Sequence, residues 1–155
     1  MGLGAVLALA IALPAPAWAQ SVEAIRKVTE VVDARREDIT DAAGRLRPHV
    51  LSGLPHEASP IQGILNVAAS FDGTANAVSL VGGLVGELKA TEDVTASVEV
   101  FRRAARRTVE SANDQLDFIN AYLHAVKSPN ALTEAVGIRD AIVAIRDALK
   151  PFTKE

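Results

Sequence analysis

The chain has 155 residues, of which 49% are hydrophobic and 4% aromatic, with a formal net charge of −3 and no cysteine. This length suits one domain with a self-sufficient core, and the lack of cysteine excludes disulfides and thiolate metal sites. A small acidic net charge argues against a nucleic-acid partner. The few aromatic side chains argue against stacking platforms for haem, sugars or bases.

The first nineteen residues have the pattern of a secretory signal peptide. An uncharged apolar run from Leu3 to Leu13 precedes two prolines, and Ala17 and Ala19 then flank a tryptophan, which is the small-x-small pattern of a cleavage site. We therefore predict that residues 1–19 are removed and that Gln20 becomes the first residue of a single mature domain, residues 20–155. The mature protein is expected in the periplasm or outside the cell.

Alternatives to a cleaved signal peptide stay open. The segment lacks the Lys or Arg with which signal peptides begin, so either its positive region is weak or the natural start lies upstream. An uncleaved membrane anchor needs about 20 consecutive apolar residues, which is longer than this run. A buried N-terminal helix is the remaining interpretation, and the same length disfavours it.

Apolar residues spaced three and four apart predict four helices, over about residues 21–46, 60–89, 92–127 and 129–150. The apolar stripe of the third is the most regular, from Val94 to Val126, whereas Thr29 and Arg36 interrupt the stripe of the first. The connections between the last three helices are short, which favours antiparallel neighbours. The predicted fold is all-α, an elongated antiparallel up-down-up-down four-helix bundle.

The second predicted helix is rich in glycine and almost uncharged. Each glycine costs about 1 kcal/mol of helix stability relative to alanine, so a kink or a break is expected near Gly73 or at Gly82 and Gly83. The run from Ala77 to Gly86 also has a small-x-x-x-small pattern, but it is too short to span a bilayer. Tight packing of a core helix is the favoured interpretation, and contact with a membrane surface is the alternative.

The third predicted helix carries a basic cluster on two successive turns, formed by Arg102, Arg103, Arg106 and Arg107. Such a cluster can hold a phosphate, a lipid headgroup or an acidic partner protein. It is equally typical of a solvated helix face, because Glu99 and Glu110 lie at i,i+4 spacing from Arg103 and Arg106 and would neutralise part of the charge.

The first predicted loop holds two histidines and a carboxylate, His49, His56 and Glu57. Two imidazoles and a carboxylate are the elements of a metal site or of a pH-sensitive hinge. Their spacing matches no ligand motif in which a turn or helix presents both rings to one ion. We therefore expect no metal and no cofactor.

No nucleophile motif or Gly-rich phosphate loop is present in the sequence. The sequence therefore predicts an exported helical-bundle module that binds or supports a partner, either another protein or a second copy, and has no catalytic activity. One alternative is a membrane-surface protein that binds anionic lipid through the Gly-rich second helix and the cluster Arg102–Arg107. A more remote alternative is a metal-dependent enzyme that uses the loop histidines.

Overall fold

The structure is a computed structural model that describes residues 17–88 and 94–154, with side chains described from residue 21 onward. Most of the described residues are helical, and none of them forms a strand. The elements in chain order are α1 (Ala17–Leu46), α2 (His49–Ser52), the 3-10 turn η1 (Pro55–Glu57), α3 (Ala58–Gly86), α4 (Thr95–Leu123), α5 (Pro129–Leu149) and the 3-10 turn η2 (Lys150–Phe152).

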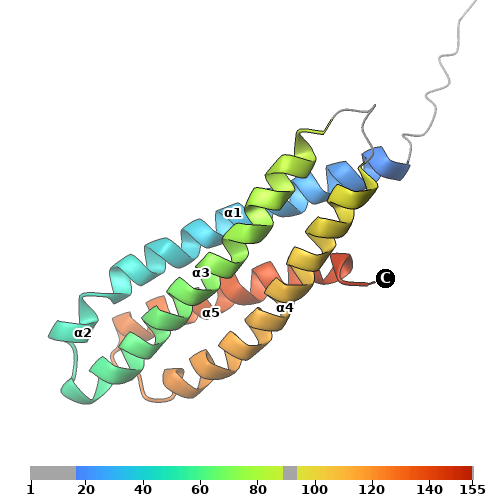
Figure 1. The fold of residues 1–155 in the computed structure, drawn as a ribbon. Helices are drawn as coiled ribbons and strands as arrows, with labels where there is room; N and C mark the ends of the chain where they lie inside the picture. Colours follow the sequence, from blue (N-terminus) through green and yellow to red (C-terminus); the bar gives the residue numbers. More distant parts are fainter. Residues whose placement is uncertain (1–16, 89–93, 155) are drawn as a thin grey trace, which may run out of the picture.

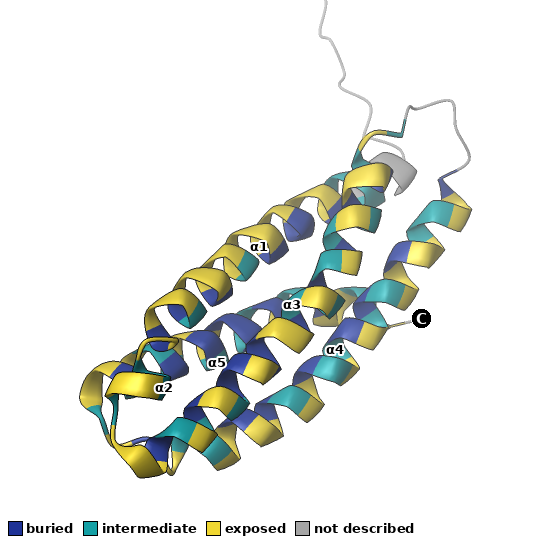
Figure 2. Cartoon of the chain, turned by 60° about the vertical axis from the view of Figure 1, so that its left-hand side comes forward, coloured by how far each residue is buried: buried dark blue, intermediate teal, exposed yellow. Residues whose placement is uncertain are grey.

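The four long helices pack against one another along their lengths (Figure 1). Helix α1 packs against α3 and α5, and α4 packs against the same two helices. Thr29 meets Gly82, and Arg36 meets Asp72, so residue numbers rise along α1 as they fall along α3. Each long helix therefore has two close neighbours, and one stripe of each faces the centre (Figure 2).

The core consists of aliphatic side chains around two fully buried phenylalanines, Phe71 of α3 and Phe101 of α4. Two buried threonines are tolerated in this core because each hydroxyl has a hydrogen-bond partner. Thr29 donates to the Ile25 carbonyl at 2.7 Å, and Thr108 donates to the Ala104 carbonyl at 2.9 Å, each one turn earlier in its helix. Throughout the described residues, every buried side-chain nitrogen and oxygen has a hydrogen-bond partner. The interior of the described residues is therefore an apolar core without an unsatisfied polar side-chain atom.

Arg36, which interrupts the apolar stripe of α1, lies at the edge of the core. Its Nε donates a hydrogen bond to Asp72 Oδ1 of α3 at 2.8 Å, and one of its terminal nitrogens lies 3.7 Å from Asp33 Oδ1. The aliphatic part of such a side chain covers apolar surface while its guanidinium stays at the rim. The interruption thus supplies an ion pair between two helices.

Several predicted helix bounds need correction. Helix α1 begins at Ala17, ahead of the predicted cleavage point between Ala19 and Gln20, and residues 1–16 of the predicted signal peptide lie outside the described residues. Helix α3 begins two residues earlier than predicted and ends at Gly86. Helix α5 agrees with the prediction to within one residue.

The third helix ends at Leu123, four residues before the predicted end. The N–H groups of Ala125 and Val126 bond in tight turns to the carbonyls of Tyr122 and Leu123, at 3.0 and 3.2 Å. Beyond them, the N–H groups of Lys127 and Ser128 bond to a side chain from another part of the chain. The apolar period continues to Val126, which is buried, but the helix does not.

Helix α3 is one uninterrupted element through all of its glycines, so the predicted break near Gly73 or at Gly82 and Gly83 is wrong. A bend at these positions stays a prediction. Packing explains why some of the glycines are there. A Cβ on Gly82 would overlap the Thr29 hydroxyl of α1, and a Cβ on Gly63 would lie 2.6 Å from the ring of Tyr122 in α4. These glycines let neighbouring helices approach closely.

The adjacent glycines Gly82 and Gly83 should respond in opposite directions to alanine. Gly83 is exposed, and a Cβ there would meet nothing within 4 Å, so Gly83→Ala should stabilise the helix by about 1 kcal/mol. Gly82→Ala should gain the same helix propensity, but overpacking against Thr29 should cost about 1–3 kcal/mol. We therefore expect a net decrease in the free energy of unfolding. Chemical denaturation measures both free energies of unfolding.

The double variant Thr29→Ala with Gly82→Ala provides the control, because it removes the overlapping hydroxyl. It should recover a large part of the loss caused by Gly82→Ala alone. Equal stabilisation by alanine at both glycines would show that α1 and α3 do not meet closely at this point.

Candidate functional site

The four predicted site arginines all lie on α4, but they do not share one face. Arg103 and Arg107 are neighbours one turn apart on the outer side, and Arg102 and Arg106 form a second pair further round the helix. Arg106 is half-buried and the other three are exposed. The basic cluster is thus two pairs of cations on adjoining flanks of α4.

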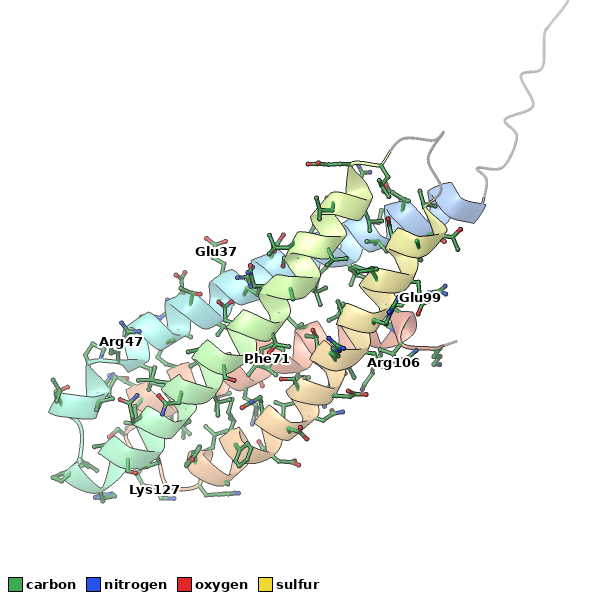
Figure 3. The ribbon with its side chains drawn as sticks, viewed as in Figure 1. Glu37, Arg47, Phe71, Glu99, Arg106 and Lys127 are labelled. Atoms are coloured by element: carbon green, nitrogen blue, oxygen red, sulfur yellow. The ribbon has the colours of Figure 1, made fainter. Side chains whose placement is uncertain are left out.

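The predicted neutralisation of this cluster is mostly absent. Arg103 Nε lies 3.9 Å from Glu99 Oε1, which is an ion pair beyond hydrogen-bond length. The predicted pair between Arg106 and Glu110 is wrong, because no carboxylate oxygen of the described residues lies within 4.0 Å of Arg102, Arg106 or Arg107. Figure 3 shows Glu99 and Arg106 on α4. A spacing of four residues permits an ion pair but does not form one.

An exposed apolar surface lies beside the outer arginines. Leu80 and Leu84 of α3 are 62% and 67% exposed, and Val100 of α4 is 46% exposed. We call these three residues the α3–α4 surface. Arg103 and Arg107 follow Val100 at about one and two turns along α4. Guanidinium groups and exposed aliphatic side chains therefore lie next to each other.

A groove runs beneath this surface between the two helices. Its volume is about 410 Å³, and it is lined by Val81, Leu84, Val85, Glu87, Leu88, Ser97 and Val100. All but two of these side chains are apolar. Sequence reasoning missed the exposed leucines, because α3 is apolar on most sides and has no polar stripe that would mark its outer face.

A second hollow, of about 690 Å³, lies between α1 and α5. Its walls carry charges of both signs, and these largely pair with each other: Arg35 with Asp38 at 2.7 Å, and Arg45 with Glu134 at 2.9 Å. Its floor contains Ala42 and Gly137. The second of these ion pairs bridges the two helices. The lining still has an excess of acidic charge, because it also contains Asp41 and Asp140.

The loop residues His49, His56 and Glu57 do not converge on one point. His49 lies on α2, and His56 and Glu57 lie on η1, where Glu57 is fully buried and His56 is exposed. Within residues 17–88 and 94–154, no group of three or more His, Cys, Asp or Glu side chains is placed to hold a metal ion. The three residues thus form no ligand set.

Glu57 instead binds the connection between α4 and α5, at the end of the bundle opposite to the start of α1. Its Oε1 accepts hydrogen bonds from the backbone N–H groups of Lys127 and Ser128, the latter at 2.8 Å, and its Oε2 accepts one from the Ser128 hydroxyl. Ser128 directly precedes α5, so the carboxylate also faces the positive end of that helix. We call these contacts the Glu57 clasp.

The clasp lowers the pKa of Glu57 below its ordinary value of 4.5. The Ser128 hydroxyl bond is the largest cause; the backbone N–H groups of Lys127 and Ser128 and the charge of His56 add to it, and burial of the carboxylate opposes it. The sequence suggested Glu57 only as one of three elements of a metal site or hinge, and no metal was expected there. Its partners lie about seventy residues away in sequence, so no local pattern identifies them.

Among the described residues, no helix is both long enough and apolar enough to cross a membrane. No protein-family model, curated protein or solved structure matches the chain.

The Glu57 clasp predicts a specific pH dependence of stability. A carboxylate with a lowered pKa stabilises the folded state fully above its unfolded pKa, and this contribution is lost as pH falls through the folded pKa. Wild type should therefore be more stable than Glu57→Gln above pH 4.5, and the difference should shrink as the pH falls below that value. Melting curves between about pH 3 and 6 measure it.

Glu57→Gln is the informative variant because glutamine keeps an oxygen for the two N–H groups. It loses the charge and replaces the Oε2 acceptor of the Ser128 hydroxyl with an NH2 donor. Glu57→Ala removes all of these contacts and should melt at a lower temperature than Glu57→Gln throughout. A difference between wild type and Glu57→Gln that does not change with pH would contradict the clasp.

Proposed function

We propose that this protein is an exported, non-catalytic helical module that binds a partner protein through the α3–α4 surface. Export rests on the signal-peptide pattern of residues 1–19, and the mature protein would act in the periplasm or outside the cell. The module would be an elongated antiparallel four-helix bundle. The opposite numbering of the residues that meet between α1 and α3 supports this direction.

The observation that carries the proposal is the exposure of Leu80 and Leu84. These leucines lie one turn apart in a stretch of α3 that has no charged residue between Asp72 and Glu87, and Val100 lies across the groove. Isolated exposed aliphatic residues are ordinary, but contiguous apolar surface with a polar rim is typical of interaction sites.

The charges beside this surface indicate the chemistry of the partner. Arg107 has no carboxylate within 4.0 Å among the described residues, and Arg103 has only the long contact to Glu99. Guanidinium groups that are unpaired or only weakly paired within the described residues, at the rim of an apolar surface, favour carboxylates opposite them. The expected partner therefore presents aliphatic side chains flanked by Asp or Glu, as an amphipathic helix does when it binds in a groove.

Site-specific photo-crosslinking in the native host tests this proposal. A photoreactive amino acid at Leu84 or Val100 should give one adduct of defined mass, recovered with the exported proteins. The matched control is Val31 of α1, another exposed aliphatic residue at 42% exposure, which should give none. Charge reversal by Arg103→Glu with Arg107→Glu should reduce the adduct at Leu84 about tenfold or more.

The outcomes separate the candidate partners. An adduct of twice the chain's own mass identifies a second copy as the partner. Adducts of equal yield at Val31, or no adduct at Leu84 and Val100, would contradict the proposal. The double variant Leu80→Ser with Leu84→Ser should change the free energy of unfolding by no more than about 1 kcal/mol, whereas Phe71→Ala in the core should cost about 3–5 kcal/mol.

A second candidate function is binding to an anionic membrane surface. It is favoured by the same juxtaposition, since aliphatic side chains beside exposed arginines also suit a lipid headgroup region. Co-sedimentation with vesicles discriminates between the two functions. Sedimentation that requires anionic lipid and is lost when Arg102, Arg103, Arg106 and Arg107 are replaced by Ala would favour the membrane. No sedimentation, together with the crosslink at Leu84, would favour the partner protein.

A further inference from the structure

A third hollow lies away from the α3–α4 surface, at the end of the bundle where α1 begins and the chain ends. Its volume is about 400 Å³, and it is lined by Ser21, Ala24 and Ile25 of α1, Val98 and Arg102 of α4, and Pro151 and Phe152 of η2. This volume lies within the range of small-molecule sites. Three separate segments build its walls.

The inner wall of this hollow is apolar and held in place. Ile25 is buried at its floor, and Val98 and Phe152 are half-buried. The ring of Phe152 packs edge-on against the fully buried Phe101, with ring centroids 5.4 Å apart and planes at 82°. Because Phe101 belongs to the core, the wall is anchored in the rigid part of the molecule.

Arg102 is the charged side chain among the lining residues. It is exposed, and no carboxylate of the described residues lies within 4.0 Å of it. Arg106, one turn further along the same flank of α4, adds a second positive charge that also has no such partner. The α3–α4 groove, by contrast, is lined by Glu87, and the charges of the α1–α5 hollow are largely paired.

A guanidinium at the rim of an apolar hollow is complementary to one kind of small molecule. Arginine binds carboxylate and phosphate through two parallel hydrogen bonds, and the aliphatic and aromatic wall provides burial for a hydrocarbon chain. We propose that this hollow binds an amphipathic anion, with its carboxylate or phosphate on Arg102 and its aliphatic chain against Ile25, Val98 and Phe152. We call it the Arg102 site.

Calorimetric titration with monomeric laurate tests the Arg102 site. Wild type should bind laurate, and Arg102→Gln should bind it about tenfold more weakly, which is the usual effect of losing a charged hydrogen-bond partner. The matched control is Arg103→Gln, which removes an adjacent arginine that does not line the hollow and should leave the affinity unchanged. Dodecanol, with the same chain and no charge, should bind wild type about as weakly as laurate binds Arg102→Gln.

A second ligand shows which anionic head group the site prefers, and a second variant controls for a folding defect. Dodecyl phosphate titrated in parallel identifies the preferred head group, and binding of either anion that depends on Arg102 supports the site. Phe152→Leu should weaken laurate binding while leaving the melting curve cooperative. Equal affinity of wild type and Arg102→Gln, an equal loss in Arg103→Gln, or binding only to vesicles of anionic phospholipid would overturn the proposal.

Discussion

The structure depends on the burial of one apolar stripe from each of four helices in a chain with few large side chains. Phe71 and Phe101 fill the centre, and elsewhere Ile, Val, Leu and Ala must exclude water by bringing the helices close together. Because Gly82 has no side chain, Thr29 packs closely between α1 and α3. In the same way, Gly63 leaves room for the ring of Tyr122 between α3 and α4. Because the buried polar groups of the described residues are also satisfied, the interior is complete and the features suited to binding lie at the surface.

The ends of the helices depend on a different interaction. After α4 has ended at Leu123, the buried carboxylate of Glu57 accepts hydrogen bonds from the N–H groups of Lys127 and Ser128 and so holds the connection to α5. The same carboxylate faces the N-terminus of α5 and complements the positive end of that helix. At the opposite end, Phe152 folds back onto Phe101, and this contact forms one wall of the Arg102 site. Binding features are thus built on contacts that also position the helices.

Helical periodicity predicts the four long helices because each stripe is a local pattern, and Pro129 marks the start of α5 to the residue. Periodicity does not predict where backbone N–H groups bond to a residue distant in sequence, as those of Lys127 and Ser128 do to Glu57. The glycines of α3 did not break that helix because packing outweighs propensity once a helix is buried on one side. The exposure of Leu80 and Leu84 had no sequence signal, and the spacing of Arg106 and Glu110 suggested an ion pair that the side chains do not make. Of the candidate site, the sequence predicts the four arginines but not the apolar surfaces beside them.

Both proposed binding sites lie between helices, so both require the four helices to pack together as described. The contact between Ala42 and Gly137 tests this packing directly, because a Cβ on Gly137 would lie 3.9 Å from the Cβ of Ala42, within the range of a disulfide, and the chain has no other cysteine. The variant Ala42→Cys with Gly137→Cys should oxidise to an intramolecular disulfide. The control is Ala42→Cys with Arg139→Cys, which places the second thiol on the opposite side of α5 and should stay reduced. Disulfide formation in the control pair but not in the Ala42 and Gly137 pair would contradict the bundle.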